Sequence, residues 1–211
     1  MSQPVITILP DESLHDALGL MRTKSIRRLP VVNKRGRLVG IVSEGDLLHA
    51  SPSDASSLSI WEMNHLLSKL TVDELMTKDV IAVPEDTPLE EAARIMADNK
   101  IGGLPIVRDG AAVGIITETD LFKVFLEMLG ARESGVRAAV IVPNVPGELA
   151  KLTGGVFEVG GNILALGTFL GERTDNREVV LKVNGVEKET LLKSVQPIVE
   201  RVVDIRDSPA A

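Results

Sequence analysis

Two short segments of this sequence place a hydroxyl and a carboxylate three residues apart, directly after an apolar run. They are Ser43-Glu44-Gly45-Asp46 and Thr117-Glu118-Thr119-Asp120. A serine or threonine followed at the third position by an acid is typical of a capping box at a helix start. A carboxylate there can also accept both hydroxyls of a ribose, while the hydroxyl and free backbone amides face a phosphate. Both interpretations stay open, because one residue pair can serve both purposes.

The two segments close two copies of one longer pattern, which runs from Val5 to Asp46 and again from Val80 to Asp120. Each copy predicts a short strand, a helix with an apolar stripe, a hairpin with glycine at its tip, and a second helix. The expected elements are strands 5–8 and 80–83, helices around 14–21 and 89–96, and hairpin arms 29–32, 38–42, 104–107 and 112–116. A unit of this size buries too little apolar surface alone, so the copies should pack together.

Positive charge gathers in the first copy, although the chain carries a formal net charge of -7. The stretch from Arg22 to Arg37 holds many basic residues and no acid, and its Arg27-Arg28 align with Gly102-Gly103 of the second copy. Guanidinium groups suit phosphate, and a glycine pair lets a flat ligand approach the backbone. The alternative is a solvated helix end and hairpin.

The composition narrows the classes of function. There is no cysteine, and the three histidines are not at metal-ligand spacing, so we expect no disulfide and no metal site. No apolar run reaches the ~18 residues of a membrane span. Negative charge and 2% aromatic residues argue against partners that are nucleic acids or anionic lipids. The start lacks signal-peptide features, which predicts a cytoplasmic protein. No catalytic constellation is present, so we expect no enzyme.

Beyond Gly130 the repeat stops and the element order becomes βαββαβ. The expected elements are strands 136–142, 163–170, 178–183 and 202–205 and helices 146–159 and 188–199. This order gives a small antiparallel sheet with two helices on one face, and the sheet edges invite pairing with a second copy. The whole chain is therefore expected to be of the α/β (α+β) class.

The doubled pattern, with Leu-Pro in each hairpin and Gly-x-x-[Ser/Thr]-x-x-Asp after it, resembles tandem CBS domains, the Bateman module, over residues 1 to about 129. The resemblance implies a cleft between the repeats that binds an adenosine ligand such as AMP, ADP or ATP, with no cofactor required. It implies that Asp46 and Asp120 hold riboses, assisted by Ser43, Thr117 and Thr119. It also implies adenine slots lined by Ile6, Ile26, Ile81 and Ile101, phosphate contacts from Arg27 and Arg28, and further contacts from Thr77, Gly102 and Gly103.

The C-terminal part resembles an ACT domain in Asn144-Val145-Pro146-Gly147 and in Gly160-Gly161-Asn162. ACT domains dimerise, and some hold an amino acid near those two turns. We expect structural pairing to be the main role here, with amino-acid binding at Asn144, Gly147 and Asn162 as the alternative. Asn144 replaces the usual aspartate and is expected to cap the following helix.

The expected domains are a first CBS repeat (1–50), a linker with a short helix near Trp61 (51–70), a second CBS repeat (71–129), a linker (130–135) and an ACT domain (136–207). A capping box at Thr71 and Glu74 opens the second repeat. The first repeat lacks the short helix that follows Thr71, so we expect the natural start to lie upstream. The arrangement resembles AcuB-type proteins, a family that is linked to acetoin utilisation.

The sequence thus predicts a regulatory protein that senses adenosine nucleotides in its CBS pair and signals through a dimeric ACT domain to a partner enzyme. Two alternatives stay open. One is an amino-acid sensor whose CBS pair is a dimerisation scaffold. The other is an interaction protein without a small ligand.

Overall fold

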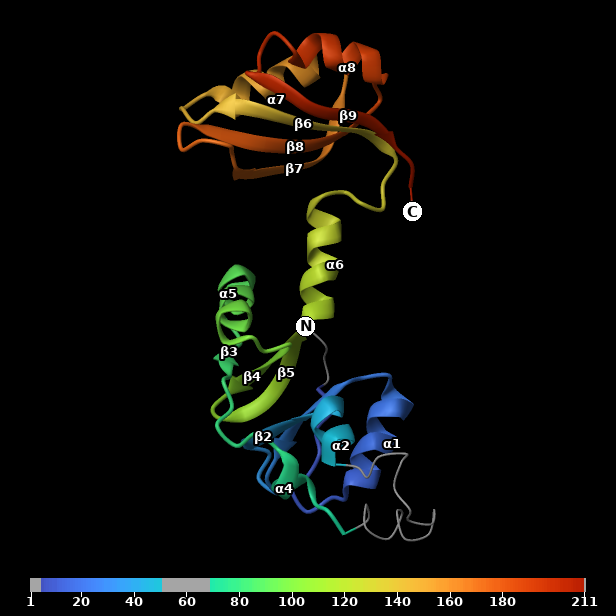
Figure 1. The fold of residues 1–211 in the computed structure, drawn as a ribbon, viewed down its shortest axis with the longest axis vertical. Coiled ribbons are helices and arrows are strands. Elements are labelled where there is room, and N and C mark those ends of the chain that lie inside the picture. Colours follow the sequence, from blue (N-terminus) through green and yellow to red (C-terminus); the bar gives the residue numbers. More distant parts are fainter. Residues whose placement is uncertain (1–4, 51–68, 211) are drawn as a thin grey trace. The chain divides into compact units, whose positions relative to one another are not determined.

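The computed structural model describes residues 5–50 and 69–210. The chain divides into two compact units, Met1–Leu121 and Phe122–Ala211, and helix α6 (Glu118–Met128) contains the boundary. Figure 1 shows the ribbon of each unit. The linker helix expected near Trp61 lies outside the described residues.

The first repeat forms the predicted helix, hairpin and second helix. Its elements are α1 (Leu14–Lys24), β1 (Arg28–Val32), β2 (Leu38–Ser43) and α2 (Glu44–Ala50), with β1 and β2 antiparallel. Helix α1 begins where the Ser13 hydroxyl accepts a hydrogen bond from the Asp16 amide at 3.1 Å. It ends at Ser25, which adopts a left-handed conformation with φ of 52°. Leu14, Ala17 and Met21 are buried, which confirms the apolar stripe.

The second repeat follows the same order. Its elements are α4 (Val72–Leu75), β3 (Val83–Pro84), α5 (Leu89–Asn99), β4 (Gly103–Arg108), β5 (Ala111–Thr117) and the first turn of α6. The predicted capping box is confirmed, because the Thr71 amide donates to Glu74 Oε2 at 2.8 Å. Ala92 and Met96 are buried on α5, again as the stripe predicts.

The first strand of each repeat is shorter than predicted. Instead of strand 5–8 there is a single parallel bridge between Ile8 and Val31, and instead of strand 80–83 there is the two-residue β3. In the first repeat the missing residues precede Ile8, where the next donor on the partner strand would be the backbone nitrogen of Pro30, and proline has no amide hydrogen to donate. Pro105 stands at the matching place in the second repeat.

The two repeats pack together through backbone hydrogen bonds, as predicted from their size. At the hairpin tips the Leu38 amide donates to the Gly110 carbonyl at 3.0 Å. Further along, Ile41 and Thr77 exchange a pair of hydrogen bonds of 3.0 and 2.9 Å. Each repeat nevertheless has its own buried apolar cluster. The first unit is therefore one body with two small cores.

The second unit confirms the predicted βαββαβ order. Its elements are β6 (Gly135–Pro143), α7 (Glu148–Glu158), β7 (Asn162–Leu170), β8 (Asn176–Asn184), α8 (Lys188–Val195) and β9 (Arg201–Ser208). The strands form an antiparallel sheet in the order β7-β8-β6-β9, with both helices on one face (Figure 1). Helix α8 ends at Val195 and not at 199 as predicted; Gln196 still has a right-handed helical conformation, but Pro197 has no amide hydrogen to continue the helix.

Helices α7 and α8 approach each other closely at Gly155. The Ser194 hydroxyl donates to the Gly155 carbonyl at 2.6 Å. A Cβ added at Gly155 would lie 2.5 Å from Ile198 Cδ1, whereas one added at the preceding Gly154 would meet nothing within 4 Å. The close contact between the helices therefore requires glycine at position 155, whereas position 154 has room for a side chain.

Lys182 of β8 is buried, with 3% of its surface exposed, which its charge did not predict. Its ammonium donates to the Gly130 carbonyl at 2.8 Å and to the Ser208 hydroxyl at 3.0 Å. These acceptors lie just before β6 and at the end of β9. The buried ammonium thus joins the segment that leads into the sheet to the last strand.

Candidate functional site

The two hydroxyl–carboxylate segments have the same geometry in both repeats. Asp46 Oδ2 accepts hydrogen bonds from the Ser43 amide at 2.8 Å and the Ser43 hydroxyl at 2.7 Å. Asp120 Oδ2 accepts from the Thr117 amide at 2.9 Å and the Thr117 hydroxyl at 2.7 Å. In return, each aspartate amide donates to the hydroxyl, at 3.2 Å in the first repeat and 3.3 Å in the second. The predicted capping boxes are confirmed at the starts of α2 and α6.

Capping uses only one oxygen of each carboxylate. Every hydrogen bond that either carboxylate accepts ends on Oδ2, and Oδ1 of Asp46 and of Asp120 has no hydrogen-bond donor among the described residues. Asp46 is exposed and Asp120 is half-buried. An ionised carboxylate oxygen can accept more than one hydrogen bond. Each motif therefore keeps a free acceptor while its helix stays capped.

The hairpins place positions 27–28 and 102–103 next to these motifs. Arg28 pairs with Ser43 across β1 and β2, and Gly103 pairs with Thr117 across β4 and β5. The Glu44 amide donates to the Arg27 carbonyl at 2.9 Å, just as the Glu118 amide donates to the Gly102 carbonyl at 3.2 Å. The structure thus brings the predicted phosphate and ribose residues together within each repeat.

The glycine pair is not open backbone, which corrects the prediction that it leaves room for a flat ligand. A Cβ at Gly103 would lie 2.5 Å from Arg28 Cδ, and one at Gly102 would overlap the Arg28 guanidinium. Arg28 also lies 3.7 Å from Glu118, measured from Nη2 to Oε2. The arginine fills the space because no side chain at 102 or 103 competes for it. Sequence reasoning missed the role of Glu118, and the only signal was an acid at the same place in both motifs.

The other predicted nucleotide residues are distributed over both repeats. Ile6 and Ile26 pack partly against the core of the first repeat, and Ile101 packs against that of the second. Ile81 is 39% exposed, so its side chain is free to contact a ligand. Thr119 is exposed on α6. Thr77 pairs with Ile41 and therefore lies against the first repeat, although it follows the start of the second.

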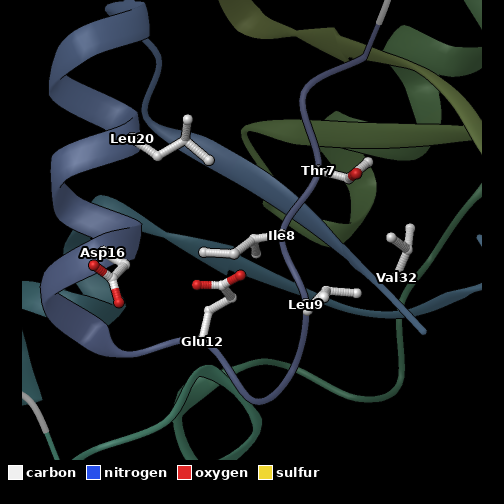
Figure 2. Close-up of a pocket in the computed structure, with 7 residues that line it drawn as sticks. All are labelled: Thr7, Ile8, Leu9, Glu12, Asp16, Leu20 and Val32. Atoms are coloured by element: carbon white, nitrogen blue, oxygen red, sulfur yellow. The ribbon is translucent and has the colours of Figure 1, made fainter. Parts of the chain in front are cut away.

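A separate pocket of about 340 Å³ lies within the first repeat (Figure 2). Its lining residues are Thr7, Ile8, Leu9, Glu12, Asp16, Leu20 and Val32. None of them belongs to the predicted nucleotide set. Two carboxylates and no basic group line the pocket, so it would repel a phosphate. We therefore do not assign a nucleotide to it.

The residues predicted to bind an amino acid do not form one site within a single chain. Asn144 and Gly147 follow the end of β6, whereas Asn162 starts β7 and bonds to Asn184 at the end of β8. Because Pro143 pairs with Asn176 and Val136 pairs with Val183, these positions lie at opposite ends of the sheet. The prediction that Asn144 caps α7 is wrong. The N-cap is Gly147, whose φ of 92° favours glycine, and Asn144 accepts a long hydrogen bond of 3.4 Å from Arg177.

Comparison with known proteins defines the class to which this fold and these motifs belong. The CBS domain model matches residues 1–53 and 72–127, and the model of the TTHA0829-like ACT domain matches residues 134–206. The chain belongs to the CBS domain family, with two CBS repeats followed by an ACT domain. Both are regulatory modules. The resemblances found in the sequence are therefore confirmed.

Individual relatives match mainly the CBS pair. An uncharacterized protein of Methanocaldococcus jannaschii is 37% identical over 133 residues, which are 59% of this chain but only 45% of that protein. CBSX2 of Arabidopsis thaliana is 33% identical over 60% of each chain, and it has been crystallised in complex with AMP, in a structure that aligns with a TM-score of 0.47. The crystal structure of a putative acetoin utilization protein (AcuB) from Vibrio cholerae is 35% identical, with a TM-score of 0.51, and covers 62% of this chain and 89% of that one.

Over residues 5–50 and 69–210, no helix is long and apolar enough to cross a membrane. Over the same ranges, no three His, Cys, Asp or Glu side chains converge in a way that could hold a metal ion.

Proposed function

We propose that this protein is a cytoplasmic regulator that binds an adenosine nucleotide in its CBS pair and passes the bound state to a partner through its ACT domain. In this account Asp46 and Asp120 accept the ribose hydroxyls. Ser43, Thr117 and the helix starts of α2 and α6 face the phosphate. The protein makes no bond in a substrate; the ligand shifts a population of conformations.

The free carboxylate oxygen of each motif carries the proposal. Both aspartates accept all their capping hydrogen bonds on Oδ2, as Glu74 does on Oε2 at Thr71, so Oδ1 stays available as an acceptor beside the hairpin. A ribose diol needs an acceptor of this kind, and the attached phosphate suits a nearby basic group. Arg28 pairs with Ser43 in the strand register, and its side chain reaches Gly102 and Gly103 of the second repeat. The sequence relationship to CBSX2, the relative crystallised with AMP, supports the same class of ligand.

The ACT domain is proposed to provide the contact between copies of the chain. Its sheet has two edge strands, β7 and β9, and large apolar side chains are exposed on the same unit, including Phe157 at 80% and Leu170 at 84%. Surfaces of this kind favour association. Native mass spectrometry of the whole chain should therefore report a dimer. A monomer at micromolar concentration would contradict this part of the proposal.

A thermal-shift panel tests the ligand class. AMP, ADP, ATP and S-adenosylmethionine are compared with GMP and with the common amino acids. A nucleotide at one hundred times its dissociation constant stabilises the native state by about 2.7 kcal/mol, which gives a clear increase in melting temperature. We expect the increase with adenosine nucleotides and not with GMP. A response to an amino acid alone would favour the ACT sensor, and no response at millimolar concentration would favour a pure interaction protein.

A further inference from the structure

Arg28 belongs to the first repeat by sequence, but its side chain lies on the second. Its Cδ is 2.5 Å from where a Cβ of Gly103 would be, and its guanidinium takes the place of a side chain at Gly102. Gly103 pairs directly with Thr117, which caps the helix that carries Asp120. The arginine therefore lies beside the second hydroxyl–carboxylate motif, where it could donate to the phosphate of a nucleotide.

The counter-ion of this arginine is Glu118, which lies between Thr117 and Asp120 in the motif itself. The Nη2–Oε2 distance of 3.7 Å is longer than the ~2.7–2.9 Å of a charge-assisted hydrogen bond. The Glu118 side chain is 62% exposed and that of Arg28 is 27% exposed, so water screens their attraction. A phosphate could accept two parallel hydrogen bonds from the guanidinium and would be the stronger partner.

The first repeat does not have this pair. Glu44 is the counterpart of Glu118, and it has no ion-pair partner among the described residues. The counterpart of Arg28 in the second repeat is Gly103, which has no charged side chain that could reach the motif of the first repeat. The two motifs share their backbone geometry but differ in their electrostatics.

We infer that Arg28 and Glu118 form a gate on the second motif, which opens when the phosphate of a nucleotide replaces Glu118 as the partner of Arg28. The inference rests on the proposed function. Glu118 competes with the ligand, and Arg28 makes the second motif select phosphorylated adenosine compounds over adenosine. The first repeat thus determines the ligand specificity of the second.

Isothermal titration calorimetry of AMP and of adenosine tests the gate. Both proteins compared are full chains with Asp46→Asn, which is expected to remove nucleotide binding at the first motif. One of them also carries Glu118→Gln. Without its competitor Arg28 is free, so AMP affinity should rise about two- to fivefold, the size of an exposed ion pair, while adenosine affinity stays the same. Glu44→Gln is the matched control and should change neither affinity.

Arg28→Met gives the opposite readout. It keeps an unbranched side chain over the glycine pair but removes the charge, so AMP affinity should fall about tenfold or more while adenosine affinity does not fall. Circular dichroism spectra of all variants verify that they are folded.

The outcomes separate the gate from the proposed function. If AMP binds and Glu118→Gln matches Glu44→Gln, or Arg28→Met leaves the preference for AMP over adenosine intact, the gate is overturned and the nucleotide proposal stands. If AMP binds only after Glu118→Gln, the gate is supported in a stronger form. If no adenosine compound binds the parent chain or any variant, both proposals fail.

Discussion

Replacement of Asp120 by asparagine is expected to remove nucleotide binding at the second CBS repeat while the protein stays folded. The asparagine carbonyl oxygen can still accept from the Thr117 amide, which Asp120 Oδ2 now does at 2.9 Å, so α6 keeps its cap. The second oxygen, however, becomes an amide group that donates hydrogen bonds and cannot accept from a ribose diol. A lost bond to a charged acceptor costs about 1.5–3 kcal/mol, so the loss of one such bond should lower the affinity by about 10- to 100-fold in calorimetry.

Asp120→Ala separates the structural part of this effect from the binding part. Alanine removes both the cap and the acceptor, so the affinity loss should match that of Asp120→Asn, with about 1 kcal/mol of unfolding free energy lost in addition. Asp46→Asn and Asp46→Ala form the matched set in the first repeat. Should AMP bind Asp120→Asn as tightly as the unmodified chain, Asp120 would be a capping residue only.

Replacement of Gly155 by valine should give the largest loss of stability in the second unit. The new branched side chain would meet Ile198 Cδ1, which already lies 2.5 Å from an ideal Cβ, and the Ser194 hydroxyl at 3.3 Å. Overpacking of a buried helix contact costs about 1–3 kcal/mol. We expect about 2 kcal/mol less unfolding free energy for this unit, and faster amide exchange in α7 and α8 by mass spectrometry.

Gly154→Ala, one position earlier on the same helix, should have the opposite effect. Its Cβ would enter open space, and alanine stabilises a helix interior relative to glycine by up to about 1 kcal/mol. Slower exchange in α7 is the expected result. If both variants shifted exchange in the same direction, the close approach of α7 and α8 at Gly155 would be wrong.

Local patterns predicted the elements of this protein well, because each pattern depends on neighbouring residues. The apolar stripe from Leu14 to Met21, the capping box at Thr71 and the glycine-tipped hairpins all arise within a few positions. The duplication strengthened these predictions, because the same pattern in both repeats supports the assignment of each helix and strand. The capping geometry of Ser43 with Asp46 was predicted for the same reason: both partners lie three residues apart.

Contacts between distant residues could not be read in this way. Nothing in the order of residues indicates that Arg28 leaves its own repeat and lies beside Glu118, because that depends on how two cores meet. The burial of Lys182 was missed since a lysine on a strand normally points to water. Asn144 was expected to cap the helix because of its residue type, but α7 begins at Glu148, and its N-cap position is Gly147, three residues after Asn144.

The ladder between β6 and β9 has a consequence for engineering. Gly135 pairs with Ser208, so the first and last strands of the ACT domain start and finish side by side in the sheet. Lys182 hydrogen-bonds to Gly130 before the first strand and to Ser208 at the end of the last one. Domains with neighbouring ends tolerate circular permutation and transplantation into loops of other proteins. A permuted ACT domain, in which a short glycine linker joins Ser208 to Gly135 and the new termini lie in the turn between β7 and β8, should therefore fold into the same sheet. A two-dimensional NMR spectrum of the backbone amides of this domain would test the prediction.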